Sequence, residues 1–458
     1  MSNTLFGSVL IFLTLFIMVI NFRYILGLLI IFLSLQMTSV INFTSLHYGL
    51  QLYRVVSILL SLSLIFFILK NDFKFNLSYE EVKLINFLTS FVLYTVFISL
   101  VGPLIFENIL VYTPKYSIDY NAMYGPFPLK FSLINIVLPF NEILFYLVFV
   151  LILIINLKNK EINFIIKCFF FTIVMILFFS FYQLFQSFIN LPNIFTFINN
   201  TVSRQFHLFT VNLSGFNIFR IAATYYEPSY LASFLIAIFS FFLSSFILYR
   251  KYLLFLILTF VIIILSTSST TYLSLLIIIL FVLFYTGIFS IKIKKVRLNH
   301  FLYLLMFLSI IVIIIINVIG IDNILLILNQ FLFEKSKSYS FINRTKADLY
   351  SFQIFLNSFG LGVGVGSTRP SSLFPYLIST VGIIGTVLFF TFLILLLRYS
   401  YKILRNTNYY NYFFLIPGAL VTQIIAYPDI TNPTLWQMIY VTIIVIKKVK
   451  YKEYRYEK

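Results

Sequence analysis

The chain has 458 residues, of which 61% are hydrophobic and only 10% are charged, and this composition excludes a soluble globular protein. The formal net charge of +18 invites comparison with nucleic-acid-binding proteins, but the positions of the basic residues argue against such a partner. The single cysteine, Cys168, lies in an apolar segment and cannot form a disulfide within one chain.

Apolar segments long enough to cross a bilayer recur along the whole sequence, because a hydrocarbon core needs about 20 apolar residues per helix. They lie near 4–21, 25–42, 54–69, 84–106, 133–156, 162–189, 225–248, 252–266, 270–290, 301–320, 373–397, 410–427 and 432–447. We therefore expect an all-α polytopic transmembrane helical bundle of about 12–14 spans, with residues 1–458 forming a single integral membrane domain. The first segment is too long, and too closely followed by the second, for a cleaved signal peptide.

Basic residues gather in alternate loops. If the tail 447–458 is cytoplasmic, the short inner loops hold most of the 32 Lys and Arg residues, as the positive-inside rule requires. The net charge therefore indicates membrane orientation, and no nucleic acid is expected as a partner.

The same alternation places two long loops on the outer side, at 190–224 and 321–372, and long ordered loops between short connections are usually functional. These loops contain basic residues that the positive-inside rule does not explain: Arg204, Arg220, Lys335, Lys337, Arg344, Lys346 and Arg369. We expect them to bind an anionic ligand on the outer face.

The first loop leads into a hydrophobic helix through Arg220, Tyr226 and Glu227. Glu227 precedes Pro228 and could simply stabilise the positive end of that helix. Alternatively, Arg220 binds a phosphate oxygen and Glu227 orients this arginine or accepts a proton from a hydroxyl nucleophile. Tyr225 and Tyr226 are typical of an interfacial aromatic belt. His207 is either an ordinary loop histidine or a further base.

In the second loop, residues 340–359 predict an amphipathic helix lying on the membrane surface. Its apolar stripe consists of Leu349, Phe352, Phe355, Leu356 and Phe359. Arg344 and Asp348 are four residues apart, so they either pair with each other or bind substrate.

A glycine ladder follows this helix, at Gly360, Gly362, Gly364 and Gly366, and Arg369 comes directly after it. The glycines are expected either to turn backbone amides toward an anion or to provide a flexible return to the membrane. The ladder lacks the Gly-Lys-Ser/Thr ending of an ATP-binding loop. His47, His207 and His300 are scattered, so neither a metal nor another cofactor is expected.

These motifs resemble those of the Wzy-type polymerases of bacterial O-antigen and capsule repeat units, in the O-antigen ligase and polymerase superfamily. The similarity covers roughly residues 200–400. It consists of Arg220 with Tyr226-Glu227-Pro228-Ser229-Tyr230-Leu231-Ala232, Ser266-Thr267-Ser268-Ser269-Thr270, Gly360 to Ser372, and Val381-Gly382-Ile383-Ile384-Gly385.

The resemblance implies a GT-C-like membrane glycosyltransferase in the bacterial inner membrane. It would join oligosaccharide units carried on undecaprenyl diphosphate at the outer face, with a flippase and a chain-length regulator as further partners. The candidate catalytic residues are Glu227, Arg220 and His207, and the general base is not assigned by the resemblance. The candidate substrate-binding residues are Arg204, Arg344, Asp348, Arg369, Gly364, Gly366 and Tyr226.

Two alternatives stay open. Related ligases carry a histidine in the second large loop, whereas this chain has none after His300, which favours a polymerase over a ligase. A flippase or exporter of the same lipid-linked units would place charges near the membrane midplane. The predicted spans contain few charges, with Glu142 as the main exception, which favours an enzyme whose site lies at one face.

Overall fold

The computed structural model describes residues 2–46, 48–70, 75, 77–114, 123–189, 191–202, 210–213, 216–266, 269–287, 339–426 and 428–456. Within these ranges the chain is a helical bundle, and seven helices are long and apolar enough to cross a membrane. They are Leu5–Phe32, Leu52–Lys70, Tyr79–Ile105, Ile134–Ile154, Asn159–Gln186, Pro228–Tyr249 and Gly382–Leu404. The predicted all-α polytopic fold is confirmed.

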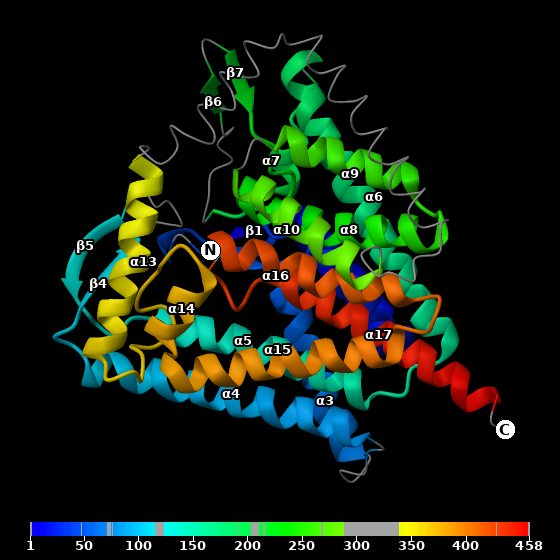
Figure 1. Cartoon of the computed structure of the whole chain (residues 1–458), viewed down its shortest axis with the longest axis horizontal. Coiled ribbons are helices and arrows are strands. Elements are labelled where there is room, and N and C mark those ends of the chain that lie inside the picture. The colour runs from blue at the N-terminus through cyan, green and yellow to red at the C-terminus, as the bar shows by residue number, and fades with distance from the viewer. Residues whose placement is uncertain are drawn as a thin grey trace.

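Figure 1 shows the arrangement of the elements. The described helices are α1 (Leu5–Asn21), α2 (Ile25–Phe32), α3 (Leu52–Lys70), α4 (Tyr79–Ile105), α5 (Ile134–Ile154), α6 (Asn159–Ile189), α7 (Phe195–Ile198), α8 (Pro228–Tyr249), α9 (Leu253–Leu265), α10 (Ser269–Tyr285), α13 (Tyr339–Asn357), α14 (Leu373–Thr380), α15 (Gly382–Leu404), α16 (Leu415–Ala426) and α17 (Pro433–Tyr456).

Three small antiparallel sheets accompany the bundle. They are formed by β1 (Ser2–Asn3), β2 (Ser39–Phe43) and β3 (Tyr48–Gln51), by β4 (Leu110–Pro114) and β5 (Met123–Pro128), and by β6 (Thr210–Leu213) and β7 (Phe216–Phe219). Apart from β1, which precedes α1, the strands lie in connections between helices, so the bundle remains an all-α fold.

Several predicted spans are shorter in the structure than in the hydropathy pattern. The apolar helices Leu253–Leu265, Thr270–Tyr285 and Tyr410–Ala426 have only 10–17 residues. The predicted segment 25–42 continues only as far as Phe32 as a helix, and β2 follows it from Ser39. The predicted segment 301–320 lies outside the described residues. Hydropathy detects burial in an apolar medium, and a short helix buried inside the bundle gives the same signal as a span.

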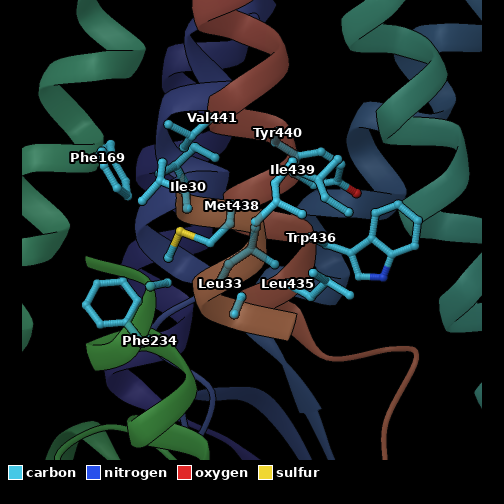
Figure 2. Close-up of a cluster of buried hydrophobic side chains, with 14 of the residues drawn as sticks. Ile30, Leu33, Phe169, Phe234, Leu435, Trp436, Met438, Ile439, Tyr440 and Val441 are labelled. Carbon is cyan, nitrogen blue, oxygen red and sulfur yellow. The ribbon is translucent and has the colours of Figure 1, made fainter. Parts of the chain in front are cut away.

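α17 forms the centre of the core. Figure 2 shows its Trp436, Met438 and Tyr440 among side chains from neighbouring helices, including Phe169 on α6 and Phe234 on α8. Trp436 and Tyr440 are almost fully buried, and Trp436 stacks on Phe145 of α5 with ring centroids 5.5 Å apart. Large aromatic rings bury much apolar surface, so this contact joins α17 to α5 within one hydrophobic core.

One end of the bundle carries most of the ion pairs that the structure describes. Lys402 on α15 pairs with Glu80 on α4 at 2.8 Å, and Lys450 on α17 pairs with Glu81 at 3.0 Å. Arg23 pairs with Glu161 of α6 at 3.1 Å. We call this the tail end, because α17 ends here. It gathers basic residues that the sequence pattern assigns to the inner face.

The opposite end, which we call the loop end, receives residues 357–382. α13 runs across the direction of α4 and α15 in Figure 1, where it is the yellow helix at the left. Its buried face, which includes Ala347, Ser351 and Ile354, packs toward α14 and β4. Leu349, Leu356 and Phe359 are 63%, 70% and 86% exposed. This geometry fits a helix whose apolar side rests in a headgroup layer.

The glycine ladder attaches this end to the bundle through close backbone packing. Gly362, Gly364 and Gly366 have φ values of +85°, +91° and +88°, which residues with a side chain rarely adopt. A Cβ on Gly362 would meet Thr380 O at 2.5 Å, and a Cβ on Gly364 would meet Ser99 Cα at 2.8 Å. The ladder is therefore fitted against α4, α5 and α15.

Replacing Gly364 by alanine should destabilise the protein more than the same change at Gly360. Both glycines have positive φ, but a Cβ on Gly360 would meet nothing closer than Phe355 at 3.4 Å. We expect a backbone cost of about 1 kcal/mol at either site and an added packing cost of about 1–3 kcal/mol only for Gly364→Ala. Thermal melting of the two purified variants measures the difference, and equal melting temperatures would contradict the packing argument.

The two ends of the bundle should face opposite sides of the membrane. Asn357 at the loop end and Asn406 at the tail end are both exposed. In a Cys168→Ser background, an impermeant thiol reagent should label Asn357→Cys in intact spheroplasts and Asn406→Cys only after permeabilisation. The reverse pattern would overturn the orientation, and labelling of both before permeabilisation would contradict the separation of the two ends.

Candidate functional site

Arg220 and Glu227, which are seven residues apart, lie within electrostatic reach of the distant Arg344 at the loop end. Arg220 precedes α8, Glu227 is the last residue before it, and Arg344 lies on α13. The Glu227 carboxylate and the Arg344 guanidinium both act electrostatically on Arg220. The group therefore combines two cations with one anion, which leaves excess positive charge available to an anionic ligand.

The segment before α8 is fixed by hydrogen bonds, and this fixes Arg220 and Glu227 at its two ends. Gln183 of α6 accepts from the amides of Ala222 and Ala223 at 3.0 and 2.7 Å. Thr224 Oγ1 donates to Ser34 O at 2.6 Å. Ala223 has φ of +49°, an uncommon backbone conformation for a residue with a side chain. Such conformations persist only where the surroundings enforce them, as these bonds do.

Glu227 lies at the N-cap position of α8 but makes no side-chain capping hydrogen bond to the helix. Pro228 occupies the first turn, as predicted. One carboxylate oxygen of Glu227 accepts from Ser229 Oγ at 3.2 Å. The side chain is therefore not used as a hydrogen-bonding cap, and its negative charge acts on Arg220.

Arg220 is half-buried, and its Nε is buried without a hydrogen-bond partner among the described residues. Burial lowers the pKa of Arg220, the Glu227 carboxylate opposes this shift, and the Arg344 guanidinium adds to it. A partly desolvated guanidinium gains from binding an oxyanion, which supplies hydrogen-bond acceptors and compensates its charge.

Asp348 has a different role from the expected pairing with Arg344. Its two oxygens accept four hydrogen bonds, from the amides and hydroxyls of Ser371 and Ser372, at 2.5–3.3 Å. A carboxylate has about four acceptor positions, so these bonds occupy most of its capacity. Asp348 thus clamps α13 to the start of α14, and its predicted part in substrate binding finds no support in this geometry.

Arg369 lies just before this clamp and points toward α8. Its Nη2 donates to the Tyr230 hydroxyl at 3.3 Å, and the Tyr230 ring contacts Tyr226 at a centroid distance of 6.0 Å. Tyr226 OH accepts from Gln51 Nε2 at 2.6 Å. Arg369 and Tyr226 therefore both lie at the loop end, close to Glu227 in the fold. Tyr225, expected in an aromatic belt, is instead fully buried because its ring packs beside Phe234 inside the bundle.

The expectation that the glycine ladder presents amides to an anion is wrong for its first three glycines. The amides of Gly360, Gly362 and Gly364 donate to Phe355 O, Ser358 Oγ and Thr380 O, at 2.9, 3.2 and 2.8 Å. Gly366 packs against Ile134 of α5. Gly364 and Gly366 serve to seat the loop on the bundle, and their positive φ values reflect that packing.

The remaining predicted residues, Arg204 and His207, lie outside the described residues. The described part of the chain holds no group of three or more metal-ligating side chains.

Tyr272 and Arg54 lie near the site although sequence reasoning did not place them there, and Glu142 is a further buried charge. Tyr272 of α10 acts electrostatically on Arg220. Arg54 of α3 lies within electrostatic reach of Tyr226. Glu142 of α5 is 1% exposed, and neither of its carboxylate oxygens has a hydrogen-bond partner in the described structure. Glu142 could be recognised in the sequence as a charge within a span, but Arg54 and Tyr272 carry no comparable signal.

No model of a protein family matches this chain, and no curated protein is similar to it.

Proposed function

We propose that this chain is a membrane glycosyltransferase that polymerises oligosaccharide units carried on undecaprenyl diphosphate, at the outer face of the bacterial inner membrane. The observation that carries the proposal is the meeting of Arg220, Glu227 and Arg344 at the loop end, away from the tail-end lysines. A diphosphate is the ligand that two neighbouring guanidinium groups would suit best.

In the proposed reaction, a sugar hydroxyl of one unit attacks the anomeric carbon of a lipid-linked chain. A new glycosidic C–O bond forms, the bond between this carbon and the diphosphate oxygen breaks, and its electron pair leaves with the diphosphate. Glu227 takes the proton of the attacking hydroxyl. Arg220 and Arg344 stabilise the negative charge that develops on the leaving diphosphate, which is commonly a large contribution to catalysis.

The surroundings of the site suit a substrate presented from a lipid leaflet. α13 carries Arg344, and its Leu349 and Leu356 are exposed, as is Phe359 just beyond its end. An amphipathic helix of this kind lies at the depth of phosphate headgroups. The diphosphate of a lipid-linked sugar could therefore reach Arg344 while its polyprenyl chain stays in the bilayer.

A second candidate function is a flippase or exporter of the same lipid-linked units, and Glu142 favours it. A buried carboxyl within a membrane span is costly and commonly marks a translocation or proton pathway. Asp429, between α16 and α17, acts electrostatically on Glu142. Ligase-like transfer of a finished chain would use the same arginines and differ only in its acceptor.

Deleting the gene separates the three functions. Loss of a polymerase should leave a single repeat unit on the surface, because unit synthesis and export continue. Loss of a ligase should leave long chains on the lipid carrier, and loss of a flippase should leave single units on the inner face. Electrophoresis of the surface polysaccharide, combined with lipid extraction from right-side-out and inverted vesicles, distinguishes these outcomes. Normal long-chain polysaccharide in the deletion strain would contradict all three.

Glu227→Gln should abolish long-chain polymer while leaving protein amount and insertion unchanged. If Glu227 is the general base, the polymerisation rate should fall about a hundredfold or more. Ser229→Ala is the matched control, because it removes the hydrogen bond to Glu227 but keeps the carboxylate.

Arg220→Lys tests the positively charged part of the same site. It should also be defective, since lysine cannot make two parallel bonds to a phosphate, whereas Arg398→Lys at an exposed position of α15 should be normal. Rates are measured with purified protein and lipid-linked units. A wild-type rate in Glu227→Gln would remove this residue from the reaction.

A further inference from the structure

A second arginine site lies at the loop end, at the start of α3. Arg54 is half-buried, and its Nε donates to the Tyr53 hydroxyl at 3.3 Å while Nη1 donates to the Tyr48 hydroxyl. The guanidinium also lies over both rings, 5.6 Å from the Tyr48 centroid and 5.7 Å from that of Tyr53. Strand β3 and helix α3 thus hold the cation in a tyrosine cage.

This cation makes no ion pair with a carboxylate in the described part of the chain. The groups that act on Arg54 electrostatically are the phenols of Tyr53, Tyr48 and Tyr226. Asp429 acts on Tyr53 but makes no ion pair with Arg54. A half-buried guanidinium with no carboxylate partner in the described structure suits an anion that completes the site.

The cage is rich in hydrogen-bond donors. A guanidinium carries about five N–H donors, and Arg54 spends only two of them on the tyrosines. Tyr48 and Tyr53 each use their oxygen as an acceptor for Arg54, so their own O–H protons can be donated to a ligand. Several donors directed by one fixed cation suit a phosphate or carboxylate oxygen.

The cage is separate from the Arg220–Arg344 group but belongs to the same region. Tyr226 links the two sites, because it acts on Arg54 and immediately precedes Glu227. Tyr226 also contacts Tyr230, which accepts from Arg369. Arg54 does not appear among the charges that act on Arg220. Arg54 and the Arg220–Arg344 group could therefore each bind an anion.

We propose that Arg54, with the hydroxyls of Tyr48 and Tyr53, forms a second oxyanion-binding site that takes an acidic group of the acceptor substrate. This inference rests on the proposed function, in which Arg220 and Arg344 hold the diphosphate of the donor. The acceptor group is either the diphosphate of a second lipid-linked unit or the carboxylate of an acidic sugar. Both present the same oxyanion chemistry to the cage.

Saturation binding to the full chain in nanodiscs tests the proposal, with labelled geranyl diphosphate and labelled glucuronate as separate probes. Wild-type protein should bind two molecules of diphosphate per chain, or one of diphosphate and one of glucuronate. Arg54→Gln should lose one site, Arg220→Gln should lose the other, and the double variant should bind neither probe. Arg398→Gln, an exposed arginine of α15, should match the wild type.

Conservative variants show whether a loss of binding reflects the changed side chain and not misfolding. Arg54→Lys keeps the charge and Tyr53→Phe keeps the ring, and each should weaken the Arg54 site about tenfold without changing the Arg220 site. Full occupancy of both sites in Arg54→Gln would overturn the proposal, and so would a wild-type protein with a single site that only Arg220→Gln removes. A single site that only Arg54→Gln removes would support anion binding at Arg54 and contradict the proposed donor site at Arg220 and Arg344. Loss of glucuronate binding alone in Arg54→Gln would identify the acidic sugar as the source.

Discussion

The cost of removing a charge from water organises this protein. Away from its two ends, the described bundle is built mostly from apolar side chains and from hydroxyls that bond to nearby backbone carbonyls, with Glu142 as a buried carboxyl group. At the tail end, Arg23 and Lys450 are matched by the carboxylates of Glu161 and Glu81. At the loop end, Arg220 and Arg54 are partly desolvated and have no ion pair within the part of the chain that the structure describes. A partly buried cation without a carboxylate partner is costly, and such groups are candidates for functional sites.

Rigidity at the loop end comes from contacts that involve the backbone more than from side-chain packing alone. Gln183 receives the amides before α8, Asp348 receives those before α14, and the ladder glycines fit against α4 and α15. These three attachments place Arg220, Arg344 and Arg369 relative to one another. Catalytic groups must be held within fractions of an ångström, and sites anchored to rigid elements satisfy this condition better than free loops do.

Much of the architecture could be predicted from hydropathy, because lipid imposes the length and composition of a spanning helix. The number of spans was less accessible, since α9 and α16 are apolar but short, and burial within the bundle gives the same pattern. The meeting of Arg220 with Glu227 followed from their proximity in sequence. The roles of the ladder amides and of Asp348 did not, because a hydrogen-bond partner such as Thr380 or Ser371 is chosen by tertiary packing. The link between Arg54 and the site could not be predicted for the same reason, because Tyr226, which forms this link, is far away in the chain.

The central position of α17 has a consequence for biogenesis. This helix is the last one described and contacts α2, α5, α6, α8, α15 and α16. The helices before it in the chain surround a space that α17 fills, so the core can close only after α17 has joined them. Insertion of the earlier helices and closure of the core are thus separate stages. A chain truncated before Pro433 would be inserted but would lack the centre of its core.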